Sequence, residues 1–463
     1  MYQLYYQPKG AWFGDCMPFG KGDEYYLFHQ RDTRNPEPFG EPFGWALTTT
    51  KDFVHYEDHG EVVPRGGDDA QDQFVFAGSV FEGEGCYHIF YTGHNRDFPA
   101  AGKPAEVLMH ATSHDLIHWE KTNDSLTFTP QPGYDQDDWR DPWVIKDTEH
   151  NQYLLILGAR LQGEKTRQSG RTVQFTSSNL KDWKFQGDFW APDLYTMHEM
   201  PDLFKMGDWW YHIVTEYSDR HKMTYRMSRS LNGPWIAPYD DAFDGRAYYA
   251  GRTFELNGQR ILFGWVATRK HDDDTENFEW AGTFMPHEVF QRADGSLGCR
   301  PPESLWGAFE DWQNVDDFRL DGETSTIKGP CIPDCGNTFA FECDIVLQDG
   351  LRTFGLRVRD NVETEDSYRY LFVVPENRFL FDRIPNEHGD FFRNIGLERP
   401  IRLEPDKTYH IRLIVDDTIA TLWVDGVALN ARMYAKPGDC LRIFASEGSL
   451  LVNNARISRT VNC

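Results

Sequence analysis

A short turn signature that recurs along the first three hundred residues constrains the fold most strongly. Its copies read Thr-Lys-Asp-Phe-Val-His-Tyr at 50–56, Ser-His-Asp-Leu-Ile-His-Trp at 113–119, Ser-Asn-Leu-Lys-Asp-Trp at 178–183 and, more loosely, Ser-Leu-Asn-Gly-Pro-Trp at 230–235. The aromatic residues that close the copies are spaced on the scale of propeller repeats. A recurrence of this kind predicts one supersecondary unit per copy.

A dense strand of aromatic and β-branched residues precedes each signature. These strands are 25–29, 87–91, 153–157 and 210–214, and a fifth, 260–265, has no clear signature behind it. Short runs of this composition, separated by Gly, Asp and Asn turns, are typical of antiparallel sheet. Five such units predict a five-bladed β-propeller, and a stack of β-sandwiches is the alternative architecture.

The pattern changes after about residue 310. Segments 408–415 and 420–424 alternate apolar and polar residues without the turn signature, which predicts a separate β-sandwich. We therefore expect an all-β chain with a catalytic propeller at 1–310, a linker near 306–315 and a sandwich at 316–463.

Charge and targeting signals limit the partners. The formal net charge is −26, which disfavours nucleic acid and anionic membrane surfaces. The chain opens without a basic start and an apolar run, and it has no stretch of membrane-spanning length, so we expect no membrane partner. The sequence leaves the oligomeric state open.

The eight cysteines are scattered, without a CxxC pair and matching histidines. A structural zinc site is therefore not expected, and free thiols in the cytoplasm are the default interpretation. Aromatic residues make up 15% of the chain. They suit a sugar-binding surface, but filling of sheet cores explains them at least as well.

Three acids fall at matching points of the repeat. Asp15, Asp141 and Glu199 lie ten, twelve and eleven residues before the dense strands that begin at 25, 153 and 210. Because equivalent positions of successive blades meet around a propeller axis, we expect these carboxylates to point into one funnel. Glycoside hydrolysis uses two carboxylates, one to protonate the leaving oxygen and one to attack the sugar or activate water.

Each acid lies among apolar residues and prolines, in Trp-Phe-Gly-Asp-Cys-Met-Pro, Trp-Arg-Asp-Pro-Trp and His-Glu-Met-Pro. Partial desolvation should raise the pKa of such carboxyls and favour proton donation. Acids next to proline also occur as ordinary turn residues that accept backbone hydrogen bonds. The shared phase of all three favours the catalytic interpretation.

These segments resemble glycoside hydrolase family 32, the invertase, levanase and inulinase family, along nearly the whole chain. Residues 12–18 are similar to its Trp-Met-Asn-Asp-Pro-Asn-Gly motif, 140–142 match its Arg-Asp-Pro motif, and Glu199-Met200 stands at its Glu-Cys motif. The resemblance implies Asp15 as nucleophile, Asp141 as the transition-state stabiliser and Glu199 as general acid/base.

The resemblance also implies a set of substrate-binding residues: Gln30, Trp45, Phe76, Ser79, Arg140 and Tyr249. Gly14, Cys16–Pro18, Leu47 and Met200 depart from the family pattern around the pocket that would hold the fructosyl ring. These departures leave the exact fructoside, its linkage and exo or endo action open.

The predicted function is hydrolysis of β-fructofuranosidic bonds in sucrose, fructo-oligosaccharides or fructans by a retaining double displacement. The expected partner is a small-molecule or oligosaccharide substrate, and no cofactor or metal is expected. Three alternatives stay open: fructosyl transfer, a five-bladed glycosidase acting on another furanoside, and a sugar-binding protein that does not catalyse.

Overall fold

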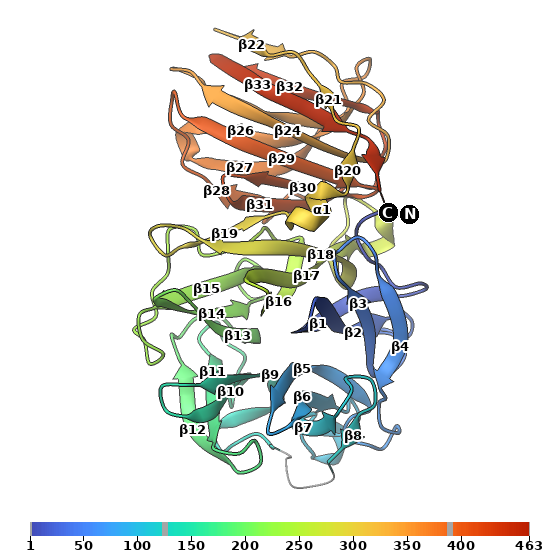
Figure 1. Ribbon diagram of the computed structural model, residues 1–463, viewed down its shortest axis with the longest axis vertical. Helices are drawn as coiled ribbons and strands as arrows, with labels where there is room; N and C mark the ends of the chain where they lie inside the picture. The colour runs from blue at the N-terminus through green and yellow to red at the C-terminus, as the bar shows by residue number, and fades with distance from the viewer. Residues whose placement is uncertain (1, 123–127, 387–391, 463) are drawn as a thin grey trace.

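The computed structural model describes residues 2–122, 128–386 and 392–462. In Figure 1 the first three hundred residues form the lower body of the molecule, and the rest forms a layered sheet structure above it. Helices in the described residues are few and short: α1 spans Glu303–Gly307, and single 3₁₀ turns span Pro99–Ala101, Lys270–Asp272 and Val374–Glu376. No helix in the described residues is long and apolar enough to cross a membrane.

The lower body consists of antiparallel units of three or four strands that follow one another along the chain. The first two are β1 (Trp12–Lys21), β2 (Glu24–Asp32), β3 (Trp45–Thr50), β4 (Glu57–Val63) and β5 (Phe74–Gly83), β6 (Cys86–His94), β7 (Glu106–Ser113), β8 (Glu120–Lys121). The third is β9 (Tyr134–Asp147), β10 (Gln152–Leu161), β11 (Gly170–Ser177), β12 (Trp183–Trp190). The last two are β13 (Glu199–Met206), β14 (Trp209–Thr215), β15 (Met223–Ser228) and β16 (Tyr248–Leu256), β17 (Gln259–Arg269), β18 (Phe278–Gln291), β19 (Leu297–Arg300).

The dense strands predicted from the sequence are the second strands of these units, β2, β6, β10, β14 and β17. The signature residues form the turn that follows the third strand. In this turn the Asp52 carboxylate accepts the backbone N–H of Val54 and of His55, at 2.9 and 2.8 Å. Asp115 does the same for Ile117 and His118. Asn179 closes the turn of the third unit in the same way, so the signature recurs in the first three units because an Asp or Asn side chain accepts these backbone N–H groups.

The first strands of the units form a closed ring. β1 contacts β5, β5 contacts β9, β9 contacts β13, β13 contacts β16, and β16 contacts β1. β1 also pairs with β18 at Phe13 and Gly282, which joins the first and last units into one hydrogen-bonded sheet. The propeller architecture is thus present. The number of separate blades stays a prediction, because this pairing merges two of the units.

The upper body is a sandwich of two antiparallel sheets. One has the order β21-β33-β24-β29-β30-β31, with β22 beside β33, and the other has the order β23-β32-β25-β26-β27-β28. The strands are β21 (Gln313–Asn314), β22 (Phe318–Asp321), β23 (Thr326–Lys328), β24 (Thr338–Leu347), β25 (Thr353–Asp360), β26 (Ser367–Val373), β27 (Arg378–Ile384), β28 (Glu398–Pro400), β29 (Thr408–Asp416), β30 (Ile419–Val424), β31 (Val427–Arg432), β32 (Cys440–Ser446) and β33 (Ser449–Ser458).

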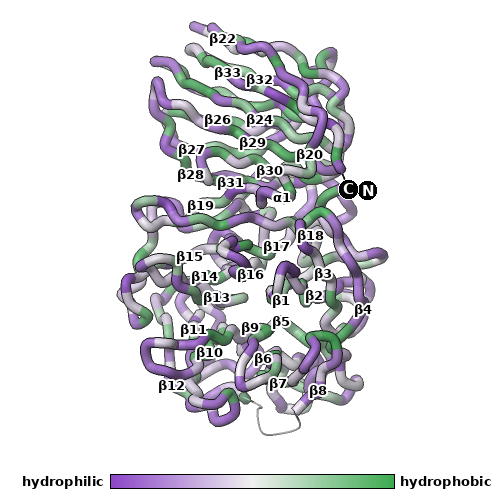
Figure 2. Tube along the Cα trace, viewed as in Figure 1, coloured by the Kyte–Doolittle hydropathy of each residue, from purple (hydrophilic) through white to green (hydrophobic). Residues whose placement is uncertain are grey.

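Hydrophobic and hydrophilic residues alternate along parts of these strands (Figure 2). In β29, Tyr409 and Ile411 are buried, whereas Thr408 and His410 are exposed, as the period-two pattern predicted. The predicted linker 306–315 contains β20 (Phe309–Glu310) and β21. These strands pair with β34 (Thr460–Val461) and β33, so the segment is tied to the sandwich. The exact boundaries 1–310 and 316–463 stay predictions.

Polar contacts and one shared apolar core join the two bodies. The Asp416 carboxylate at the end of β29 accepts the backbone N–H of Gln3, Leu4 and Tyr5 at 2.9–3.1 Å. A single cluster of buried residues includes Tyr248 and Met285 from the propeller and Leu429 from the sandwich. The sandwich therefore supports the propeller through a buried interface.

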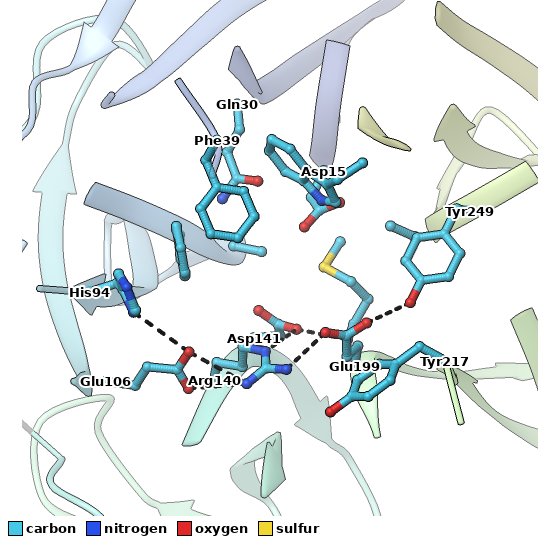
Figure 3. A pocket seen from close by; sticks show the side chains of 15 residues that line it. Asp15, Gln30, Phe39, His94, Glu106, Arg140, Asp141, Glu199, Tyr217 and Tyr249 are labelled. Atoms are coloured by element: carbon cyan, nitrogen blue, oxygen red, sulfur yellow. Dashed lines mark hydrogen bonds and ion pairs between the residues drawn. The ribbon is translucent and has the colours of Figure 1, made fainter. Parts of the chain in front are cut away.

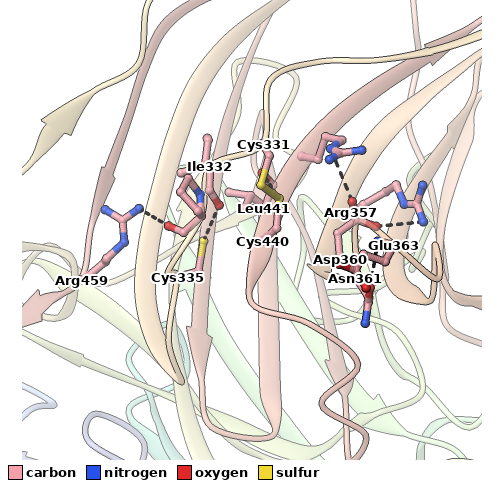
Figure 4. Close-up of a disulfide and its surroundings, with 12 residues drawn as sticks. Cys331, Ile332, Cys335, Arg357, Asp360, Asn361, Glu363, Cys440, Leu441 and Arg459 are labelled. Carbon is pink, nitrogen blue, oxygen red and sulfur yellow. Dashed lines mark hydrogen bonds and ion pairs between the residues drawn. A yellow bond between two sulfur atoms is a disulfide. The ribbon is translucent and has the colours of Figure 1, made fainter.

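One cysteine prediction is wrong. Cys331 and Cys440 form a disulfide, shown in Figure 4, although free thiols were expected throughout. The two residues are 109 positions apart in the chain, and a bridge between Ile332 and Leu441 brings their backbones together. Among the described residues, Cys16, Cys86, Cys299, Cys335 and Cys343 are free.

Candidate active site

A β-bulge interrupts each first strand at the same level of the ring. The pairing with the second strand shifts between Phe13 and Cys16 in β1, Phe76 and Gly78 in β5, Arg140 and Trp143 in β9, Glu199 and Asp202 in β13, and Tyr249 and Arg252 in β16. A bulge places extra residues opposite one partner and redirects a side chain. The three candidate acids lie within or directly before three of these bulges.

The bulges surround one pocket of about 360 Å³ (Figure 3). Its lining combines acids, one arginine and an aromatic wall: Asp15, Gln30, Phe39, Phe76, Ala77, His94, Glu106, Arg140, Asp141, Glu199, Met200, Tyr217, Tyr249, Ala250 and Trp280. Asp15, Asp141 and Glu199 therefore share one cavity, as their phase in the repeat predicted. No group of three or more His, Cys, Asp or Glu residues in the described segments is arranged to hold a metal ion.

Asp15 lies on β1, where its surroundings disfavour the ionised form of its carboxyl. Burial, followed by the charges of Asp141 and Glu199, raises the pKa of its carboxyl to about 8. The indole N–H of Trp265 donates to Asp15 Oδ1 at 3.2 Å and acts in the opposite direction, as does the charge of Arg252. The Asp15 carboxyl therefore holds a proton more readily than an exposed aspartate does.

Asp141 is held rigidly by its backbone. Its φ of 63° lies in the left-handed region, and its N–H donates to Thr92 Oγ1 at 2.9 Å. The backbone N–H of Met200 donates to Asp141 Oδ2 at 2.9 Å. Burial raises the pKa of this carboxyl to about 6, against the opposing charges of Arg140 and Arg252.

Glu199 accepts two hydrogen bonds from opposite sides. Arg140 Nη2 donates to Oε1 at 2.8 Å, and the Tyr249 hydroxyl donates to Oε2 at 2.6 Å. Arg140 comes from β9 and Tyr249 from β16, so two neighbouring strands orient the carboxylate that β13 carries (Figure 3). The carboxylate is thereby fixed at the wall of the pocket.

Arg140 is anchored away from Glu199 by a second set of acids. Its Nη1 donates to Asp138 at 2.9 Å and to Glu106 Oε2 at 3.3 Å. Burial acts to raise the pKa of Glu106, but Arg140 and His94 outweigh it and keep that pKa below its ordinary value. Glu106 is therefore a fixed negative charge that orients Arg140.

Aromatic side chains form the opposite wall. The Phe76 ring stacks on His94 at a centroid distance of 4.3 Å, and Phe39 meets Phe76 and Trp280 edge to face, at 5.4 and 5.3 Å. A Cβ atom at Gly14 would lie 2.7 Å from Trp280, so the glycine makes room for this ring. The departure from the family pattern at Gly14 is therefore coupled to the position of Trp280.

Gln30 faces the pocket with an unused acceptor. Its Nε2 donates to the Val75 carbonyl at 3.3 Å, and its buried Oε1 has no hydrogen-bond partner among the described residues. A buried acceptor of this kind is costly unless a ligand satisfies it. It is well placed for a hydroxyl group.

Two predicted binding residues lie outside the lining. Trp45 is fully buried, and its indole N–H donates to the Phe76 carbonyl at 3.1 Å, so it supports the aromatic wall from behind. Ser79 is also buried, one residue beyond the bulge of β5. The sequence interpretation missed Phe39, His94, Glu106, Tyr217 and Trp280, which lie outside the repeated acid positions.

If Glu199 takes part in catalysis, Tyr249→Phe should lower kcat/KM by about 10- to 100-fold, the effect of losing one hydrogen bond to a charged group. The reason is that Glu199 keeps Arg140 but loses its second orienting donor. Steady-state kinetics beside Tyr91→Phe, a buried tyrosine that bonds to Asp72 outside the pocket, provide the measurement and the control. Equal effects of the two substitutions would contradict the role of Tyr249.

Comparisons with known proteins cover both bodies. The sequence model described as glycosyl hydrolases family 32 N-terminal domain matches residues 5–296, and that described as glycosyl hydrolases family 32 C terminal matches residues 311–459. A sucrose-6-phosphate hydrolase of Escherichia coli is 23% identical over 97% of this chain and 93% of its own. A levanbiose-producing levanase of Bacillus subtilis (strain 168) is 23% identical over 91% of this chain and 82% of its own.

Solved structures share the fold. Fructan 1-exohydrolase IIa from Cichorium intybus superposes with a TM-score of 0.80 at 16% identity, covering 100% of this chain and 98% of that one. The sucrose-6-phosphate hydrolase from Lactobacillus gasseri has a TM-score of 0.76 at 19% identity, covering 100% of this chain and 93% of that one. The propeller and the sandwich thus occur together in proteins of distant sequence.

Proposed function

The chain belongs to glycosyl hydrolase family 32, and on that premise we propose that it hydrolyses β-fructofuranosidic bonds with retention of configuration. The observation that carries this proposal is the convergence of Asp15, Asp141 and Glu199 at the bulges of one ring, in a single pocket. Sucrose, fructo-oligosaccharides and fructans are the proposed substrates, in line with the names of the relatives.

In the proposed first step, Glu199 protonates the glycosidic oxygen while Asp15 attacks the anomeric carbon, C2, of the fructosyl unit. The bond from C2 to the leaving oxygen breaks, and a bond from C2 to an Asp15 carboxylate oxygen forms. Glu199 is suited to this role because Arg140 and Tyr249 fix both of its oxygens. In the second step Glu199 accepts a proton from water, whose oxygen displaces Asp15 from C2.

Asp141 is proposed to bind fructosyl hydroxyls through hydrogen bonds that strengthen as the ring flattens. Its rigid, left-handed backbone supports this, since a fixed acceptor costs no reorganisation during the reaction. Gln30 is proposed to accept from a hydroxyl through its free Oε1, and the Phe39, Phe76 and Trp280 wall to pack on apolar sugar faces.

The raised pKa of Asp15 sets a requirement for this chemistry. With a pKa of about 8, the Asp15 carboxyl holds a proton near neutral pH in the empty pocket. The mechanism requires that this proton lie on Glu199 and that Asp15 be ionised when the substrate is bound. A bound substrate would place its leaving oxygen at Glu199, which is where the mechanism uses the proton.

The test is product analysis with sucrose, sucrose 6-phosphate, 1-kestose and levan. We expect fructose release from at least one of them, with the β-anomer formed first in an NMR time course. Initial formation of the α-anomer would contradict retention, and oligosaccharide products at high sucrose would identify transfer as the main reaction. Cleavage of aryl arabinofuranosides alone, or binding without turnover, would overturn the proposal.

The cytoplasmic location also stays a proposal, supported by the similarity to sucrose-6-phosphate hydrolases. The Cys331–Cys440 pair makes it testable, since disulfides are rare in reducing compartments. In rapidly alkylated cell extracts, an intact Cys331–Cys440 disulfide would contradict the cytoplasmic location, and two reduced thiols would support it.

A further inference from the structure

Arg252 joins neighbouring strands of the ring without lining the pocket. It follows the bulge of β16, and its side chain is fully buried. One guanidinium nitrogen, Nη2, donates to the Asp141 carbonyl at 2.6 Å, and the other, Nη1, donates to the Gly78 carbonyl. Gly78 and Asp141 lie at the bulges of β5 and β9, so one side chain connects three of the five first strands.

Among the described residues, Arg252 forms no direct ion pair with a carboxylate. Both hydrogen bonds end on backbone carbonyls, and in the described part of the chain its Nε has no partner. Arg140, in contrast, shares its charge among Glu199, Asp138 and Glu106. The charge of Arg252 therefore remains available to nearby carboxylates, among them Asp141 and Asp15.

The ionisable groups around Arg252 come from three strands. Asp15 and Cys16 face it from β1, Asp141 from β9 and Asp202 from β13. Burial lowers the pKa of Arg252 to about 10, and the acids act to raise it, so the group stays charged at neutral pH. The charges of Asp141 and Glu199 raise the pKa of Asp15, whereas the Trp265 N–H donor and the charge of Arg252 lower it.

We propose that Arg252 is a positioning residue for the reaction: it fixes the β9 bulge that carries Asp141 and favours the ionised, attacking form of Asp15 through its charge. The inference rests on the proposed function. The two roles are separable. Bulge fixation needs two donors that diverge toward two carbonyls, whereas the effect on Asp15 needs only a positive charge at this position.

The kinetic test compares Arg252→Gln with Arg252→Lys. We expect Arg252→Gln to move the acidic limb of the kcat/KM profile to higher pH, by up to about 1 unit, because Asp15 loses an opposing cation. Arg252→Lys should leave that limb in place and still lower kcat, because an ammonium group does not reproduce the forked contact. Arg260→Gln is the matched control, since Arg260 is a largely buried arginine bonded to Thr253 and Glu255.

An unchanged acidic limb in Arg252→Gln, or the same shift in Arg252→Lys and in Arg260→Gln, would overturn the charge role. Full kcat in Arg252→Lys would overturn the bulge role. If Arg252→Gln does not fold, the lysine variant alone decides: a displaced limb or an unchanged kcat contradicts the proposal. Circular dichroism and thermal unfolding establish which variants are folded.

A second readout needs no activity. Unfolding free energies of wild type, Asp15→Asn, Arg252→Gln and the double variant are measured between pH 4 and 9. With Arg252 present, the gain in unfolding free energy caused by Asp15→Asn should level off near pH 8. In the Arg252→Gln background, this gain should keep rising to higher pH. The same pH course in both backgrounds would overturn the coupling. This result stands even if no fructoside is cleaved, so failure of the proposed function is recognised separately.

Discussion

Asp15→Asn should lower kcat for fructose release at least ~10⁴-fold, on the scale of losing a nucleophile that acts as part of a unit. The amide has nearly the shape of the carboxylate and can still accept the Trp265 N–H, but it cannot form the fructosyl-enzyme. Initial rates of fructose release, with 1-kestose or sucrose as substrate, provide the measurement. Substrate binding should persist, because the rest of the lining is unchanged.

Asp72→Asn is the matched control for this substitution. Asp72 is buried like the site acids, and it bonds to Tyr91 and Lys121 outside the pocket. We expect it to affect stability and to leave turnover within a few-fold of wild type. Substantial fructose release by Asp15→Asn, in protein free of wild-type contamination, would remove Asp15 from the mechanism.

The same Asp15→Asn change should stabilise the fold at neutral and alkaline pH. Burial, with the charges of Asp141 and Glu199, raises the pKa of Asp15 to about 8 in the folded protein, from 3.8 for an unperturbed aspartate. Between these values the folded state binds a proton that the unfolded chain releases, so the stability contributed by Asp15 falls as pH rises. Asparagine does not ionise, so its advantage should be absent below pH 4, grow up to about pH 8 and then level off.

Urea unfolding at pH 4, 6 and 8 would measure this advantage. A difference in unfolding free energy that stays constant across this pH range would show that the pKa of Asp15 is not raised in the folded protein. Loss of turnover together with a gain in stability is the pattern expected of a residue retained for chemistry at a cost to the fold.

Glu199→Gln should lower kcat on sucrose by about 10²–10⁴-fold, the range for loss of a general acid and base. With a nitrophenyl fructofuranoside, whose leaving group departs without protonation, Glu199→Gln should slow the first step much less. Because water activation in the second step also fails, a burst of nitrophenol should precede slow turnover. Stopped-flow absorbance would record the burst.

Azide provides the internal control for Glu199→Gln. A small anionic nucleophile needs no general base, so it should restore turnover in this variant and yield fructosyl azide. It should not restore Asp15→Asn, which lacks the nucleophile for the first step. An equal loss on sucrose and on the activated substrate, without rescue by azide, would assign Glu199 a structural role only.

Local chemistry made much of the fold predictable. Asp52 and Asp115 close the same turn in successive units, so the repeat is a pattern of short-range hydrogen bonds that is visible in the sequence. The second strands are visible in the sequence as apolar runs, because their residues are buried on both faces of a stacked sheet. The shared phase of Asp15, Asp141 and Glu199 then predicted their meeting through the symmetry of a closed ring alone.

Contacts between distant segments were not predictable in this way. The family resemblance implied that Trp45 binds substrate, but this side chain lies behind Phe76 and does not line the pocket. Its orientation depends on packing against neighbouring residues, which the sequence does not reveal. Trp280 and Glu106 enter the lining from β18 and β7, outside the first strands. Cys331 and Cys440 pair across 109 positions, which their spacing did not indicate.

The sequence by itself determined the all-β class, the repeated units, the sandwich and the three acids, since these depend on periodicity and on contacts within a few residues. Only the tertiary structure decided how the acids are held: the bulges that redirect them, the bonds from Arg140 to Glu199 and from Arg252 to the Asp141 carbonyl, and the Gly14–Trp280 contact. The physical reason is that electrostatic and packing interactions depend on distances in space, and a chain that closes into a ring brings residues together independently of their separation in sequence.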